Sequence, residues 1–100
     1  MGVMLAITLV AGAHFDSEAR QLSAQGAAAA DLRAPSAAVA RVKAERTARE
    51  RAEKKLAAAL KELGYKKTAD EILKKAEVVN EDFGSDGSVQ LTLRATLPSK

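Results

Sequence analysis

The sequence predicts an α+β fold in which one long helix and a short helix pack on a small antiparallel sheet with a C-terminal β-hairpin. Three observations support this prediction. Residues 37–63 contain neither glycine nor proline, residues 88–97 alternate between polar and apolar side chains, and the segment between them changes from a helical to an extended period. The chain has 100 residues, enough for one domain. We therefore expect a single small α+β domain over residues 14–100.

The long helix is expected over residues 36–63. Ser36 can cap the amide groups of the first turn, Pro35 prevents extension towards the N-terminus, and Gly64 occupies the position where helices commonly end. Alanine favours the helix, and acidic–basic pairs four residues apart add support. These pairs are Glu45–Arg49, Arg46–Glu50, Arg49–Glu53 and Glu50–Lys54. The apolar side of this helix is expected to consist of Ala38, Val42, Ala48, Ala52, Leu56, Ala59, Leu60 and Leu63.

The C-terminal part is expected to form a short helix and then a hairpin. Thr68 and Glu71 have the spacing of a capping box, which predicts a helix over residues 68–76. A hairpin follows over residues 77–97, with Asp86-Gly87 in its turn. Its second strand should point Val89, Leu91, Leu93, Ala95 and Leu97 inward and Gln90, Thr92, Arg94 and Thr96 outward.

A less regular alternation predicts an earlier strand over residues 20–26, followed by a loop that begins with residues 27–30. A helix that begins at Ser17 is the alternative, because Glu18, Ala19 and Arg20 favour helical structure.

The N-terminal residues 3–13 form an uncharged apolar segment. As a helix they would extend for about 16 Å, half of a bilayer core, so they are too short to span a membrane. Their length and the closing Ala11-Gly12-Ala13 match a signal peptide, which we expect over residues 1–13 and which predicts a periplasmic or cell-envelope location. No basic residue precedes Arg20, whereas a signal peptide carries positive charge before its apolar segment. The alternative is a buried strand or a short core helix that stays in the fold.

The composition argues against an enzyme. The chain has no cysteine and a single histidine, His14. This composition excludes disulfides, thiol nucleophiles and the common zinc sites. Residues 82–87 partly resemble a calcium loop, but Gly84 and Leu93 occupy positions where oxygen ligands are needed, and a hairpin turn explains the same residues. We therefore expect no catalytic, cofactor-binding or metal-binding residue, no cofactor and no small-molecule substrate.

The long helix is basic over residues 41–55, with seven basic and three acidic side chains. This pattern supports an alternative function, a cytoplasmic nucleic-acid-binding module. The basic residues are distributed around the helix and no aromatic residue interrupts them, so a solvated, salt-bridged face explains the pattern better. Contact with an anionic membrane surface is left open by the same charges.

Several segments together resemble a known bacterial family. Residues 23–26 belong to an expected strand that ends in Gly26. Ala–Arg and Ala–Glu–Arg repeats follow in residues 40–56. Asp86-Gly87-Ser88-Val89 then leads into the last strand. In these features residues 20–97 resemble the twenty-kilodalton bacterial membrane-associated lipoprotein family (Lpp-twenty-like), to which a flagellar assembly protein T module is similar. The resemblance implies an exported envelope protein without established catalytic residues. This chain lacks the cysteine that is lipidated in lipoproteins, and its segment between Gly64 and Glu77 is short.

The expected function is that of a non-enzymatic exported cell-envelope protein, a small structural or protein-interaction module. Alanine makes up 22 of the 47 hydrophobic residues, so the core should be thin. A small sheet leaves strand edges exposed, and pairing between chains would cover them. We therefore expect a protein partner or a homo-oligomer.

Overall fold

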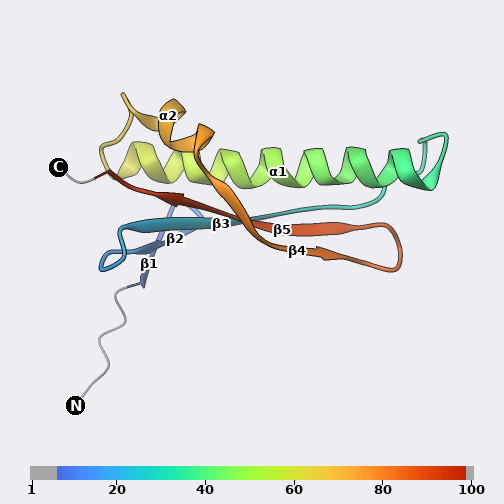
Figure 1. The fold of residues 1–100 in the computed structure, drawn as a ribbon, viewed down its shortest axis with the longest axis horizontal. Helices are drawn as coiled ribbons and strands as arrows, with labels where there is room; N and C mark the ends of the chain where they lie inside the picture. The colour runs from blue at the N-terminus through green and yellow to red at the C-terminus, as the bar shows by residue number, and fades with distance from the viewer. Residues whose placement is uncertain (1–6, 99–100) are drawn as a thin grey trace, which may run out of the picture.

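The computed structural model describes residues 7–98 and has the α+β fold that the sequence predicts (Figure 1). Residues 1–6 of the expected signal peptide lie outside the described residues. Along the chain the elements are β1 (Ile7–Val10), β2 (Ala13–Asp16), β3 (Gln21–Ala28), α1 (Ala37–Glu62), α2 (Ala69–Lys74), β4 (Glu77–Phe83) and β5 (Val89–Thr96).

The five strands form one antiparallel sheet in the order β1-β2-β3-β5-β4. β3 and β5 lie at its centre and pair along their whole length, from Gln21 opposite Thr96 to Ala28 opposite Val89. Residues 27 and 28 belong to β3, so the expected loop there is wrong, and so is the alternative helix from Ser17. Pairing with β5 determines this outcome, because an alanine-rich segment has little strand propensity of its own.

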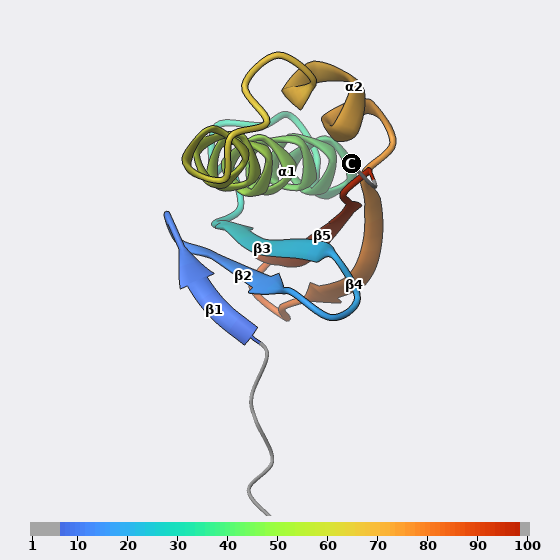
Figure 2. The same ribbon diagram turned by 90° about the vertical axis from the view of Figure 1, so that its left-hand side faces the viewer.

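α1 lies along the sheet over β3 and β5 (Figure 2). Its start is as predicted, because the Ser36 hydroxyl accepts a hydrogen bond from the Val39 amide. The expected apolar side is wrong at its first two residues, since Ala38 is exposed and Val42 is 56% exposed. The buried side consists of Ala44, Ala48, Ala52, Leu56, Ala59 and Leu60. With alanine on every side of the N-terminal half of the helix, its apolar period is too weak to fix the orientation.

The backbones of helix and sheet lie in direct contact at Gly26, in the middle of β3. A Cβ atom at this position would overlap the carbonyl oxygen of Ala48 and lie 2.7 Å from the amide nitrogen of Ala52. Glycine on the strand and alanine on the helix therefore let the two backbones pack directly. Larger buried side chains on the helix and on both central strands, including Leu22, Leu56 and Leu91, complete the core.

The C-terminal elements follow the prediction with one exception. The hairpin of β4 and β5 forms, and all five residues expected to point inward from its second strand are buried. The helix expected over residues 68–76 is shorter, and Thr68 makes no capping bond with its side chain. The Thr68 hydroxyl instead donates to the carbonyl oxygen of Tyr65, at 3.5 Å, so the expected capping box does not form.

Part of the segment expected to be a signal peptide lies in the sheet. β1 pairs with β2 through a turn in which Ala11 and Gly12 have positive φ, and Ala13 is fully buried. Cleavage after Ala13 would remove β1 and this one core residue, while the contacts of α1 with β3 and β5 would remain. Cleavage itself stays a prediction.

We expect Gly26→Ala to lower the free energy of unfolding by about 3 kcal/mol, because the added methyl group meets the main chain of α1. Chemical denaturation measures the loss. Ala27→Val is the matched control, since Ala27 is exposed on the opposite face of the same strand. Equal stabilities for the two variants would contradict the close approach at Gly26.

Candidate interaction surfaces at the sheet edges

The described part of the chain has three stretches of unpaired strand edge. The β1 edge is the outer side of Ile7–Val10, which is uncharged and exposes 67% of Leu9. The β3 half-edge is the side of residues 24–28 that β2 does not reach, because β2 pairs only with Gln21, Leu22 and Ser23. The β4 edge is the outer side of Glu77–Phe83. Each stretch carries main-chain groups that could pair with another strand.

Two basic side chains of α1 cover the β3 half-edge. The Lys55 ammonium donates to the carbonyl oxygen of Gln25 at 2.9 Å, and the Arg51 guanidinium donates to that of Ala27 at 2.6 Å. These carbonyl groups point away from β5, so no strand satisfies them. Charged side chains laid across an edge discourage pairing with another chain. The sequence indicated this only through the i,i+4 spacing of Arg51 and Lys55, which places both on one side of the helix.

The β4 edge is uncovered. Figure 2 shows α1 above β3 and β5, with β4 at the side of the sheet. Val78, Val79 and Phe83 remain 38%, 45% and 47% exposed, although they are the large apolar residues of this strand. The same strand carries three carboxylates, on Glu77, Glu81 and Asp82. β4 therefore exposes apolar and acidic groups on both faces as well as an unpaired edge.

The pairing with β5 determines which part of the β4 edge is regular. The Gly84 amide donates to the Ser88 carbonyl at 2.8 Å, so by alternation the main-chain groups of Glu81 and Phe83 point away from β5. The register shifts between Val78 and Asn80, where one extra residue interrupts the alternation. The regular part of the edge is therefore residues 80–83.

The end of the β4 edge is held against the helix by a cation–π contact. The guanidinium carbon of Arg41 lies 4.9 Å from the centre of the Phe83 ring. Such a contact at a partly exposed site contributes about 0.5–1 kcal/mol. It fixes the orientation of Phe83 at the point where β4 meets its turn.

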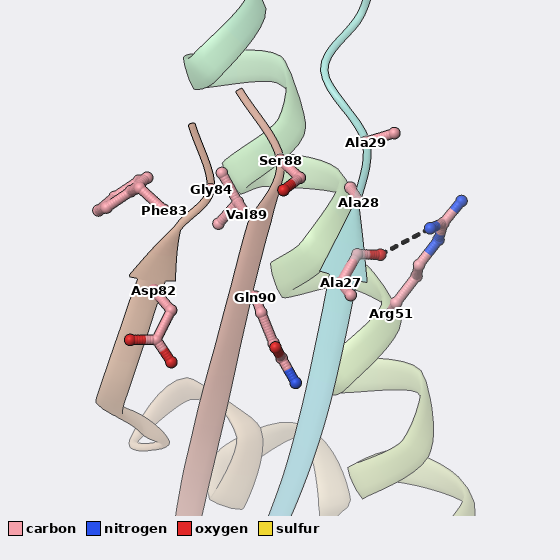
Figure 3. Close-up of a pocket in the computed structure, with 10 residues that line it drawn as sticks. All are labelled: Ala27, Ala28, Ala29, Arg51, Asp82, Phe83, Gly84, Ser88, Val89 and Gln90. Atoms are coloured by element: carbon pink, nitrogen blue, oxygen red, sulfur yellow. Dashed lines mark hydrogen bonds between the residues drawn. The ribbon is translucent and has the colours of Figure 1, made fainter. Parts of the chain in front are cut away.

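A shallow groove of about 470 Å³ lies beside this turn, between the ends of β3, β4 and β5 (Figure 3). Its charged side chains are Asp82 and Arg51, and the Arg51 guanidinium is already engaged by the Ala27 carbonyl, as Figure 3 shows. The remaining lining is formed by Ala27, Ala28, Ala29, Phe83, Gly84, Ser88, Val89 and Gln90. Asp82 and Arg51 lie on opposite sides of β5 in this groove, as Figure 3 shows.

The residues that suggested a calcium loop form the end of β4 and the hairpin turn. The Asp86 carboxylate accepts hydrogen bonds from the Ser88 hydroxyl at 2.6 Å and the Ser88 amide at 3.0 Å. The side-chain bond from Ser88 is the main reason that the pKa of Asp86 is lowered. Within residues 7–98 no group of three or more His, Cys, Asp or Glu side chains could hold a metal ion. His14 lies exposed on β2, opposite Ser23.

Five of the seven basic residues in 41–55 have a partner within the molecule, and for four of them this partner lies outside α1. Their partners are Phe83 for Arg41, Asp31 for Lys43, Glu53 for Arg49, and main-chain carbonyl groups for Arg51 and Lys55. Of the four expected i,i+4 ion pairs, the described residues form the one between Arg49 and Glu53. The basic helix is therefore largely engaged within the molecule, which weakens its use for phosphate groups.

Comparison of the chain with protein-family models, with curated proteins and with solved structures finds no match. The resemblance to the lipoprotein family therefore stays a prediction. In the described residues no helix is long and apolar enough to cross a bilayer.

We expect the double variant Arg51→Met, Lys55→Met to lose about 1–2 kcal/mol of stability, because two edge carbonyl groups lose their donors. It should also self-associate with increasing concentration, because the β3 half-edge becomes uncovered. Denaturation and sedimentation velocity measure the two effects. The control is Arg46→Met, Lys54→Met, which removes the same charge from exposed positions of the same helix. Identical behaviour of the two double variants would show that the edge contacts contribute nothing.

Proposed function

We propose that this protein is a non-enzymatic protein-interaction module whose docking surface is the β4 edge. The observation that supports this most directly is the exposure of β4 on both faces and along its outer edge, in a strand with three large apolar side chains. A strand added to an exposed edge gains main-chain hydrogen bonds for affinity and side-chain contacts for specificity. Residues 80–83 present regular pairing groups for such an addition.

The β3 half-edge, the groove and the basic helix support this function less well. The β3 half-edge is covered by Arg51 and Lys55, and the groove beside the turn is shallow, with its two charged side chains on opposite sides of β5 (Figure 3). The nucleic-acid alternative would depend on the basic helix, whose side chains mostly contact the chain itself. The β4 edge combines exposed apolar surface with unpaired main-chain groups, which is the combination that a protein partner can use.

We also propose that the protein acts in the periplasm or cell envelope, after removal of residues 1–13. The uncharged apolar segment and its small closing residues support this location. The proposed docking surface does not depend on the segment, because β4 is at the opposite end of the sheet from β1.

We expect protein recovered from its native host to begin at His14 and to fractionate with the periplasm or envelope. N-terminal sequencing of the purified chain, combined with cell fractionation, provides the measurement. A chain that begins at Met1 or Gly2 and remains in the cytoplasm would overturn the proposed location. It would leave the proposed docking surface unaffected.

For the docking surface, we expect a photo-reactive benzoylphenylalanine at Phe83 to give a discrete cross-linked product in the native host. The same group at Val42 is the control, since Val42 is similarly exposed but lies on α1. Adding Glu81→Pro should abolish the product, because proline removes an amide that points away from β5. Equal products from positions 83 and 42, or a product that survives the proline, would contradict docking at this edge.

A further inference from the structure

We propose that the occupant of the β4 edge is an extended basic segment of a different protein, added as a strand beside residues 80–83. This inference rests on the proposed function and names the chemistry of its partner. It follows from the charges of β4, from the faces on which they lie and from the absence of compensating cations on the same strand.

The charge of β4 is opposite to that of the whole chain. The chain has a formal net charge of +3, yet residues 77–83 contain three acidic side chains and no basic one. In residues 7–98 the ion pairs are Lys43–Asp31 and Arg49–Glu53, so none of the three β4 carboxylates is neutralised by an ion pair. At physiological salt their field extends over roughly 8 Å, which is the range of a neighbouring strand.

The carboxylates of the regular part of the edge lie on opposite faces. Asp82 pairs in register with Gln90 and shares the outer, polar face of the sheet. Glu81 pairs with Leu91 and shares the face that carries α1. An added strand with basic residues on both of its faces would therefore place one cation near each carboxylate. Opposite-charge pairs across neighbouring strands are favourable, and like-charge pairs are unfavourable.

The apolar part of the same edge also suits a segment that mixes basic and apolar residues. Phe83 lies on the helix side, opposite Val89, and remains half exposed. Its ring already holds one cation, that of Arg41. Aromatic and long side chains on adjacent strands contact each other directly and diagonally, so an apolar residue of the partner would cover the exposed part of this ring.

A second copy of this chain fits the β4 edge poorly. Two β4 strands side by side would bring two sets of Glu77, Glu81 and Asp82 together, with no basic residue on either strand. The register shift at Val79 also limits the length of regular pairing. Both features discourage self-association and leave residues 80–83 accessible to a strand that brings positive charge.

The test uses the full chain and three synthetic probes with blocked ends. The first is the basic peptide Thr-Lys-Lys-Val-Lys-Lys-Thr, whose lysines lie on both faces of an extended strand. The second replaces each lysine by glutamate, and the third is the basic peptide with alternate amides N-methylated. Calorimetric titration gives the affinities, and amide chemical shifts locate the binding site. We expect the basic peptide to bind about tenfold more tightly than the acidic one, as two cross-strand charge pairs would provide. Amide shifts should concentrate in residues 80–83, higher salt should weaken binding, and N-methylation should abolish it.

The charge-reversed variant Glu81→Lys, Asp82→Lys should lose the preference for the basic peptide. Glu18→Lys, Glu62→Lys is the matched control, because it makes the same change in net charge at exposed positions outside β4 and should bind as the wild type does. Thermal unfolding of both variants checks that each is folded. Loss of preference in both variants would assign the effect to net charge and overturn the proposed site.

The remaining outcomes separate this inference from the proposed function. Equal binding of the basic and acidic peptides at residues 80–83 would overturn the basic partner and retain docking at β4. A concentration-dependent dimer with shifts at residues 80–83 would identify a second copy as the occupant and overturn a basic foreign strand. Binding of neither peptide would overturn the inference, while the cross-link at position 83 would decide the proposed function independently.

Discussion

The direct packing of α1 on β3 at Gly26 is the constraint on which the rest of the structure depends. Because a glycine faces Ala48 and Ala52, the backbones approach more closely than any larger residue at that position would allow. The short distance brings Arg51 and Lys55 within reach of the β3 carbonyl groups. It also buries alanines that would contribute little to a core if the two layers were farther apart.

The position of α1 determines which strands stay exposed. A helix with its side chains is about 10 Å wide and neighbouring strands are about 4.8 Å apart, so one helix covers about two strands. α1 covers β3 and β5, and α2 is too short to cover another strand along its length. No helix therefore lies along β4, which α1 contacts at Phe83 through Arg41. The exposed helix-side face of β4 follows from the single long helix, and its exposed edge follows from its place as the last strand of the sheet.

The sequence predicted the elements whose signals are local. α1 begins at a capping serine and continues without glycine or proline, and β5 alternates from Val89 to Leu97, so neither depends on distant residues. β1 could not be separated from a signal peptide, because a short apolar segment with small residues at its end fits both and only pairing with β2 distinguishes the strand. The sequence likewise could not predict which side of the first half of α1 faces the sheet, since alanines occur on all sides of it.

The docking surface could not be predicted, because the sequence does not reveal the strand order. The alternation of residues 88–97 indicates one buried face, but it does not show that β5 lies between β3 and β4. Once that order is known, the charged residues of β4 can be interpreted. Glu81 faces the helix side, and in a central strand its carboxylate would be buried at high cost without a partner. Charged residues on both faces are compatible only with an edge, and there they favour a partner of opposite charge.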